Sequence, residues 1–467
     1  MTLITRVLAV PAVGAYYYDD LSALQARPIP LAERYTARPV TPGFRRVREV
    51  AEAVSVGLVL DTGQVAWGDC AAVEFSGKAG RDPIFRTEGG LATIRRTVAP
   101  ALQGRALTGF RELAAEVEAL LESVEVIRPL PHLEEDGAEK EWSRRELLTA
   151  PARWLRPERV AGVEPTEEEV TGHVTEERRL HTAIRYGVSQ ALLKGAALAR
   201  GVTMAEVIAQ EWGLPLPDAP VPIHAQSGGQ RYDNADKMIA RRVASLPHAL
   251  VDNIPEQLGE DGNELTRYAR WLKARVQELG GEDYCPTIHL DVHGALGQIF
   301  ENNLGRVLGH LHALELAVQP YPLRVECPVM MESRAAQIQA MKTLREYVRL
   351  RKMNVQLVAD EWANTLDDIR AFVDAQAVDM IQIKMPDLGS VHNTVEAVLS
   401  CQAGGVRAFL GGSCAETDLS ARVAVHVALA TRPDILMAKP GMGVDEGITV
   451  VQNEMARTLA WIGARGA

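Results

Sequence analysis

Four short stretches decide the fold: IHLDV (288–292), RVECP (324–328), LVADE (357–361) and IQIKMP (381–386). Each is an apolar run typical of a strand buried on both faces, and each carries a charged residue toward its carboxyl end. They belong to a series of runs that alternate with helical segments and begin 25 to 39 residues apart: VPIHAQS (221–227), HALVDNI (248–254), TIHLDVH (287–293), LRVECPV (323–329), VQLVADE (355–361), MIQIKMP (380–386), RAFLGGS (407–413) and ILMAKPG (435–441). Eight strand–helix units predict an α/β fold, an eight-fold β/α barrel, although periodicity alone leaves other α/β arrangements open.

The chain before the barrel has a different character. Two β-branched runs within residues 47–73 flank Asp61-Thr62-Gly63, a hairpin pattern, and residues 90–104 and 110–124 follow with helical spacing. We therefore expect an N-terminal α+β domain over residues 1–165 and a barrel domain over 166–467. Residues 125–178 are rich in charge and proline, which indicates a surface insertion, part helical and part irregular; a lid or an oligomer contact is the alternative.

Composition and charge exclude several classes of protein. Of the 467 residues, 61 are acidic and 50 basic, so the net charge is −11, which disfavours nucleic acid and anionic membrane surfaces as partners. The five cysteines form no C-x-x-C pair, which fits a reducing, cytoplasmic compartment. No apolar run is long enough to span a membrane. A short apolar run after Arg6 resembles a signal peptide, but Pro11 interrupts it, so we expect no cleavage.

Charged residues follow one another on four successive runs. Asp291, Glu326, Asp360 and Lys384 lie 35, 34 and 24 residues apart, about one unit each. A barrel would bring all four to its carboxyl-end rim. Three converging carboxylates repel one another unless a cation neutralises them, and an all-oxygen ligand set favours Mg²⁺. Taken singly, each acid could instead pair with a neighbouring Lys or Arg.

Two residues are candidates for acid–base chemistry. Burial and a nearby cation would lower the pKa of Lys384 and make it a usable base, the alternative being a salt bridge to Asp360 or Glu361. His248 begins the second predicted run, on the opposite side of the barrel, and could act on the other face of a substrate; a lone histidine there could also be structural.

Uncharged polar groups on the same runs are candidates for binding a substrate carboxylate or ammonium group. These are Gln226, at the end of the first run, Gln382, on the same strand face as Lys384, and the Gly412-Ser413-Cys414 segment with its backbone N–H, hydroxyl and thiol groups. His289 and His293 flank Asp291, but three alternate residues span too far for all to reach one ion, and Asp291 is the preferred ligand.

The pattern of these residues resembles that of the enolase superfamily. The sequence around them is similar to that of the methylaspartate ammonia-lyase family. The resembling stretches cover most of the chain: GDCAAVEFSGKAGRDP, LHTAIRYGVSQALL, GGQRYDNADKMI, LPHALVDNI, IHLDVHG, ECPVMMES, VADEWANT, IQIKMPDLG, GGSCAET and KPGMGVDEG. The family usually has threonine where this chain has Ser413, and most of the insertion is extra.

The resemblance implies an activity and a site. It implies elimination of ammonia from L-threo-3-methylaspartate to give mesaconate, a reversible reaction in glutamate catabolism, by an α+β-capped barrel. The implied Mg²⁺ ligands are Asp291, Glu326 and Asp360, with Lys384 as the base at C3 and His248 as the second acid–base group. Substrate binding is implied for Gln226, His248, Gln382, Ser413 and Cys414. A homodimer and K⁺ as an activator are also implied.

Two other interpretations stay open. One is a different reaction of the superfamily that starts with the same proton abstraction: racemisation, cycloisomerisation or acid-sugar dehydration. The amides and the Ser413-Cys414 pair favour the ammonia-lyase. The other is a catalytically silent metal-binding or scaffold protein, against which the presence of both Lys384 and His248 argues.

Overall fold

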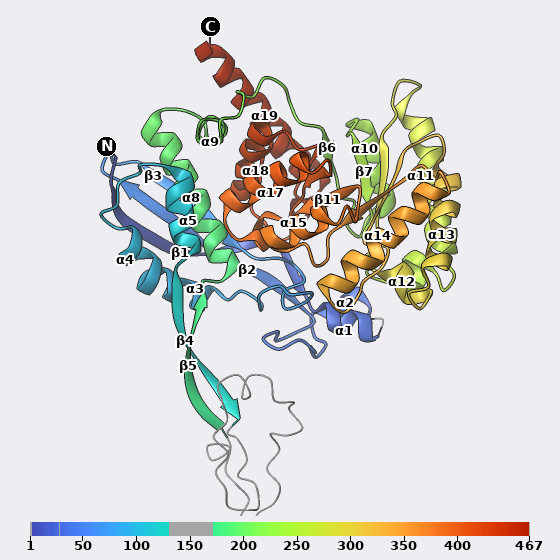
Figure 1. Ribbon diagram of the computed structural model, residues 1–467, viewed down its shortest axis with the longest axis horizontal. Helices are drawn as coiled ribbons and strands as arrows, with labels where there is room; N and C mark the ends of the chain where they lie inside the picture. Colours follow the sequence, from blue (N-terminus) through green and yellow to red (C-terminus); the bar gives the residue numbers. More distant parts are fainter. Residues whose placement is uncertain (1, 28, 130–170, 467) are drawn as a thin grey trace, which may run out of the picture. The chain divides into compact units, whose positions relative to one another are not determined.

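The computed structural model describes residues 2–27, 29–129 and 171–466. The chain divides into two compact units, residues 1–119 with 181–467 and residues 120–180. The larger unit contains the barrel and an antiparallel sheet, and the smaller one contains a strand pair (Figure 1).

The predicted barrel is confirmed. Eight parallel strands close in the order β10-β11-β12-β13-β6-β7-β8-β9. The strands are short and almost wholly buried, as expected for a sheet covered on both faces. Their bounds are β6 Ile223–His224, β7 Ser245–His248, β8 Thr287–Asp291, β9 Leu323–Glu326, β10 Val355–Ala359, β11 Met380–Ile383, β12 Arg407–Leu410 and β13 Ile435–Met437.

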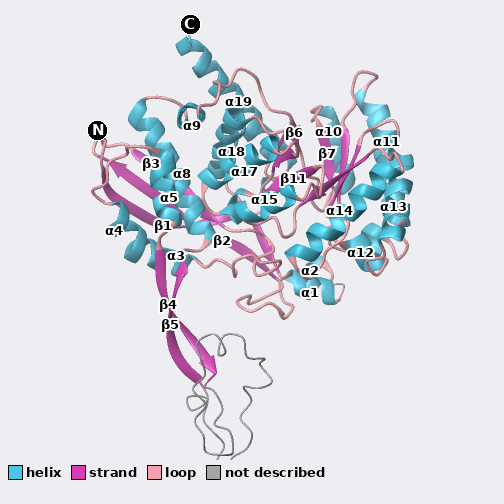
Figure 2. Cartoon of the chain, in the orientation of Figure 1, coloured by secondary structure: helices cyan, strands magenta, loops and turns pink. Residues whose placement is uncertain are grey.

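Helices alternate with these strands along the chain (Figure 2). Helix α14 begins after Ser333, whose side chain accepts a hydrogen bond from the N–H of Ala336. The helical elements from the barrel region are α10 Arg231–Ala240, η3 Ile254–Leu258, α11 Asn263–Gly280, α12 Ala295–Ile299, α13 Leu304–Val318, α14 Arg334–Leu350, α15 Leu366–Asp374, α16 Met385–Leu388, α17 Val391–Ala403, α18 Asp418–Thr431, η4 Pro440–Met442 and α19 Val444–Gly466.

The second predicted strand was wrong in its position. HALVDNI (248–254) is not a strand; β7 precedes it and ends at His248. His248 and Ala249 have φ values of 64° and 51°, so the extended backbone cannot continue through them. His248 therefore lies at the carboxyl end of its strand, with the acidic residues, rather than at a strand start.

A three-stranded antiparallel sheet precedes the barrel, in the order β1-β2-β3. The predicted hairpin is confirmed, with the turn at residues 61–64 between β2 and β3. Helix α8 packs closely on β3. The two backbones approach so closely at Gly68 that a Cβ there would lie 2.1 Å from the carbonyl oxygen of Gly187. The bounds are β1 Ile4–Asp19, α1 Leu21–Ala26, α2 Leu31–Arg34, β2 Arg48–Leu60, β3 Val65–Ala71, α3 Thr87–Thr93, η1 Ile94–Val98, α4 Ala99–Leu102, α5 Phe110–Glu118, α8 Thr182–Arg200 and α9 Met204–Trp212.

The smaller unit, at the two described ends of the predicted insertion (residues 125–129 and 171–178), is extended chain rather than the expected mixture of helix and irregular structure. Its described residues form one antiparallel pair, β4 Leu121–Pro129 and β5 Thr171–Arg179, with Leu121 opposite Arg179 and Pro129 opposite Thr171. The helix expected over residues 110–124 ends at Glu118, because the β-branched residues after it pair with β5. The centre of the predicted insertion, residues 130–170, lies outside the described residues.

None of the described helices is both long enough and apolar enough to cross a bilayer.

Candidate active site

The predicted site residues meet at the carboxyl ends of the barrel strands. His248, Asp291 and Glu326 are the last residues of β7, β8 and β9, and Asp360 and Lys384 directly follow β10 and β11. The ladder register places Asp291 opposite Glu326. A small cavity here is lined by most of the predicted set: Gln226, His248, Asp291, Asp360, Gln382, Lys384, Ser413 and Cys414.

The three predicted metal ligands are all buried and influence one another's charge. Burial, together with the negative charges of Asp291 and Asp360, raises the pKa of Glu326 well above its ordinary value. Burial also raises the pKa of Asp360, while the Lys384 ammonium opposes that effect. Burial opposes ionisation of Asp291 too, but the hydrogen bond from His248 outweighs it and the pKa of Asp291 is lowered. Ionisation of Glu326 and Asp360 is therefore disfavoured without an added positive charge, which a divalent cation would supply.

The donor atoms form two groups that could hold a metal. His248, His289 and Glu326 form one group, and His293, Asp360 and Glu361 form the other; within each, the ligand atoms lie within 4.8 Å of one another. Glu326 and Asp360 thus fall in different groups. Asp291 falls in neither group, and the histidine nitrogens in both are ligands typical of transition metals, so the preference for Mg²⁺ rests on the carboxylate oxygens of the predicted set alone.

Lys384 pairs with Asp360, Nζ to Oδ2, at 2.6 Å. Burial lowers the pKa of Lys384, but the nearby Asp360 carboxylate outweighs it and the pKa is raised above the ordinary value. The predicted lowering is therefore wrong for this structure, and the alternative, a salt bridge to Asp360, is what it contains. The lysine becomes a better base only when the charge of Asp360 is neutralised by another cation.

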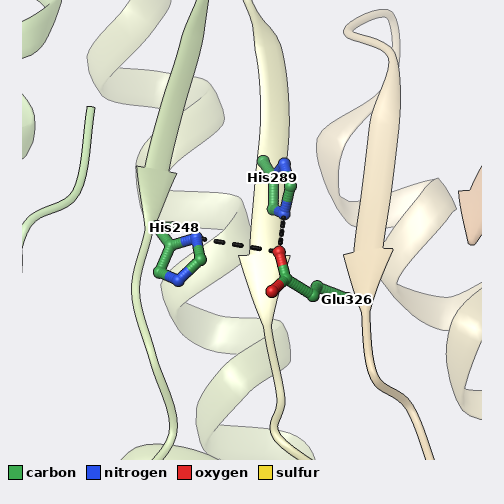
Figure 3. Close-up of side chains that lie close together, drawn as sticks. All are labelled: His248, His289 and Glu326. Carbon is green, nitrogen blue, oxygen red and sulfur yellow. Dashed lines mark hydrogen bonds and ion pairs between the residues drawn. The ribbon is translucent and has the colours of Figure 1, made fainter. Parts of the chain in front are cut away.

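His248 lines the cavity and lies within a cluster of polar side chains. Its Nε2 is 3.3 Å from Asp291 Oδ2, and its Nδ1 is 3.9 Å from Glu326 Oε2. His289 Nε2 lies 2.7 Å from the same Glu326 oxygen, so both rings approach one carboxylate (Figure 3). Strands β7 and β11 are four positions apart in the eight-strand ring, which puts His248 and Lys384 on opposite sides, as predicted.

The predicted substrate-binding groups have distinct surroundings. Gln382 donates a hydrogen bond to Glu326 Oε1 at 2.5 Å, while its own side-chain carbonyl oxygen is buried and has no hydrogen-bond partner among the described residues. The Cys414 thiol faces Gln226 Oε1 at 3.9 Å.

The Ser413 hydroxyl is engaged within the protein. It donates to Ala72 O and accepts from the N–H groups of Glu74 and Ala415. This hydroxyl therefore joins the barrel loop to the segment after β3.

Two cavity-lining residues were missed by the sequence reasoning. Arg81 is buried and pairs with Glu361 at 2.6 Å and Asp387 at 2.9 Å. Its Nη2 lies 3.7 Å from Asp360 and has no hydrogen-bond partner in the part of the chain that the structure describes. Burial and the charge of Asp19 raise the pKa of Glu74 to about 8. Both come from the loop after β3, where no periodic pattern marks a functional position. Their presence in GDCAAVEFSGKAGRDP, one of the resembling stretches, was the available signal.

Sequence comparison decides the family. The family described as "Methylaspartate ammonia-lyase C-terminus" matches residues 215–464, and "Methylaspartate ammonia-lyase N-terminus" matches residues 2–129 and 143–213. The chain belongs to the methylaspartate ammonia-lyase family. Members of this family are carbon–nitrogen lyases, so the predicted enzyme class and the resemblance are confirmed.

Relatives of the methylaspartate ammonia-lyase family match along the whole chain. Methylaspartate ammonia-lyase 2 of Carboxydothermus hydrogenoformans is 44% identical, with 99% of each chain covered. Methylaspartate ammonia-lyase of Clostridium tetanomorphum is 40% identical, again with 99% of each chain covered.

Solved structures of methylaspartate ammonia-lyases agree with the fold. The β-methylaspartase of C. tetanomorphum, solved as a Mg complex, is 39% identical with a TM-score of 0.81, covering 99% of this chain and 100% of that one. The Citrobacter amalonaticus enzyme containing (2S,3S)-3-methylaspartic acid is 39% identical with a TM-score of 0.84 and the same coverage. The Bacillus subtilis L-Ala-D/L-Glu epimerase, 15% identical at a TM-score of 0.57 over 95% of this chain and 91% of that one, shares the fold alone.

Proposed function

We propose that this chain removes ammonia from L-threo-3-methylaspartate to give mesaconate, in a reversible reaction that depends on Mg²⁺. The observation that carries this proposal is the placement of Lys384 and His248 on opposite sides of one cavity, beside buried carboxylates, in a chain that matches methylaspartate ammonia-lyases over its full length. The solved relative that contains 3-methylaspartic acid supports the substrate.

Asp291, Glu326 and Asp360 would hold the Mg²⁺. The raised pKa of Glu326, caused by burial and by the charges of Asp291 and Asp360, supports this assignment, as does the Mg complex of the Clostridium relative. When bound, the ion would hold a substrate carboxylate and stabilise the negative charge that develops as the adjacent C–H bond breaks.

Lys384 would take the C3 proton of the threo substrate. The electron pair of the C3–H bond then forms the double bond to C2, and the C2–N pair leaves with ammonia. His248, across the cavity, would exchange a proton on the other face of C3. The carbonyl oxygen of Gln382 and the Gln226 amide would orient the substrate's polar groups, and the Gly412–Cys414 segment would bind a carboxylate.

Ammonium release separates this reaction from the others of the superfamily. The purified chain would be incubated with Mg²⁺ and either L-threo-3-methylaspartate or aspartate, and ammonium and the ultraviolet absorbance of a conjugated diacid would be followed together. We expect both signals, stronger with the methylated substrate. Racemisation, cycloisomerisation or acid-sugar dehydration would release no ammonium. A silent scaffold would show no exchange of the C3 proton with solvent deuterium.

The proposal includes four further properties that the family resemblance implies. They are activation by K⁺, a homodimer, a cytoplasmic location and a place in glutamate catabolism. Replacing K⁺ by Na⁺ in the assay tests the first, and sedimentation equilibrium tests the second.

A further inference from the structure

A buried ion pair lies directly behind the predicted carboxylate-binding loop. Lys439, which follows β13, and Glu416, which follows β12, are fully buried, and Nζ lies 3.1 Å from Oε2. Neither side chain lines the cavity, and the proposed reaction uses neither. Burying two charges is costly unless each is also well hydrogen-bonded, so their other partners indicate what the pair does.

Those partners are backbone groups of the loop and one tyrosine. Glu416 Oε2 accepts the N–H of Ser413 at 2.6 Å, and Lys439 Nζ donates to the carbonyl oxygen of Gly411 at 3.0 Å. Glu416 Oε1 accepts the hydroxyl of Tyr186, on helix α8, at 2.6 Å. Burial, followed by the charge of Glu416, raises the pKa of Tyr186 well above its ordinary value, so this hydroxyl remains a donor.

The loop backbone also packs directly on the pair. A Cβ on Gly412 would lie 2.5 Å from both Glu416 Oε2 and Lys439 Nζ. Only glycine allows the loop to approach so closely. Two elements that are distant in the sequence, α8 and the loop after β13, thus hold the Gly411–Cys414 stretch from behind, together with Glu416 of the same loop.

This arrangement leaves particular N–H groups available. The N–H of Ser413 is committed to Glu416, whereas those of Gly412 and Cys414 donate no hydrogen bond to the described part of the chain. Both residues line the cavity. The free N–H groups on either side of the Ser413 N–H can donate hydrogen bonds to an anion, provided that the loop conformation does not change.

We propose that Glu416, Lys439 and Tyr186, hereafter the Glu416 network, are positioning residues that preset the Gly412–Cys414 loop to receive a substrate carboxylate. This inference rests on the proposed function and adds to it the group that maintains the binding conformation. Because the network acts on ground-state binding of the carboxylate, its loss raises KM more than it lowers kcat.

The test compares two network variants with a matched control. Glu416→Gln keeps the shape but removes the charge, and Tyr186→Phe removes one donor while keeping the ion pair. Arg345→Met breaks another buried ion pair, with Asp379 at 2.7 Å, at the amino ends of the strands. KM, kcat, the inhibition constant of mesaconate and the Mg²⁺ dependence of the unfolding temperature are measured for each.

We expect Glu416→Gln to raise KM and the mesaconate inhibition constant at least about tenfold, and Tyr186→Phe to raise them less. The Mg²⁺ response stays as in the wild type, and Arg345→Met lowers the unfolding temperature without changing KM. Glu416→Gln combined with Lys439→Met removes the unpaired charge but keeps an acceptor for the Ser413 N–H, so part of the affinity should return.

The outcomes separate this inference from the proposed function. A folded Glu416→Gln protein with unchanged KM would overturn the positioning role. If that variant does not fold, an unchanged KM in Tyr186→Phe would overturn it instead. If the wild type releases no ammonium, the proposed function fails, and calorimetric titration of mesaconate into the wild type and Tyr186→Phe still tests the network.

Discussion

Two buried arginines, at opposite ends of the barrel strands, show how a structural charge cluster differs from a functional one. Arg345 donates to Asp379 and to the carbonyl oxygen of Gln376, and the second oxygen of Asp379 accepts the N–H of Leu357. Arg81, at the carboxyl ends, faces the three carboxylates of Asp360, Glu361 and Asp387 yet leaves Nη2 without a hydrogen-bond partner.

Some of the unmet hydrogen-bonding capacity of the described residues lies in the cavity with Arg81, although other such atoms, among them Arg324 Nη1 and Thr394 Oγ1, lie elsewhere. Among the described residues, Gln382 Oε1 and His293 Nε2 have no hydrogen-bond partner, and Glu361 Oε1 has only an ion-pair contact with His293 Nδ1 at 3.2 Å. Such atoms are costly in a folded protein unless a ligand completes them. The contrast indicates that the Arg345 cluster exists for stability, whereas the Arg81 side of the barrel is built around something it binds.

The largest expected effect comes from the base. Lys384→Ala should reduce turnover of L-threo-3-methylaspartate by about 10²–10⁴-fold or more, because no other amine lies at that position. Steady-state ammonium release measures the change. Arg345→Met is the matched control: it should cost about 3–5 kcal/mol of unfolding free energy and leave the rate intact. A near-normal rate for Lys384→Ala would show that Lys384 is not the base that takes the C3 proton.

Metal removal should reduce activity by a similarly large factor, because the proposed metal ligands lie at the carboxyl ends of the strands. Exhaustive EDTA treatment should stop catalysis, and Mg²⁺ should restore it. At one hundred times its dissociation constant, the ion should also stabilise the fold by about 2.7 kcal/mol. Calorimetric unfolding of the wild type and Glu326→Gln tests the site, since the variant should lose the stabilisation. Full activity after EDTA would exclude the mechanism.

His248 should matter for one substrate face more than the other. The diastereomer at C3 presents its proton to the opposite side, so His248→Ala should slow exchange of that proton by about 10²-fold and affect the threo substrate less. Deuterium incorporation at C3, followed by NMR for both diastereomers, measures the ratio. Equal losses on both would show that the histidine only supports the fold.

The smallest expected effect is a pH dependence at Glu74. Its pKa of about 8 lies above the ordinary 4.5, with burial as the first cause, so the folded state holds a proton that the unfolded state releases between these values. Stability should therefore decline as the pH rises from about 4.5 to 8, by on the order of 1–3 kcal/mol.

Glu74→Gln cannot lose this proton. The stability of Glu74→Gln relative to the wild type should therefore grow across the same pH interval, as measured by urea unfolding at pH 5 and pH 8. A constant difference would contradict the assignment.

The barrel and much of its rim could be predicted from the sequence. Strand–helix alternation indicates the class because it is a local property, and Asp291, Glu326, Asp360 and Lys384 stand out because a charge in a strand buried on both faces needs a reason. The position of β7 could not be predicted, because LVDNI is as apolar as a strand and only the positive φ at His248 and Ala249 ends it.

The sequence by itself determined which chemical groups the site contains and about where along each strand they lie. Only the tertiary structure decided how they are paired: that Lys384 contacts Asp360, that Arg81 enters the cavity from the loop after β3, and that Glu416 holds the loop of Ser413 from behind. The physical reason is that strand and helix patterns depend on neighbours along the chain, whereas charge pairing and pKa depend on distances between segments that only folding brings together.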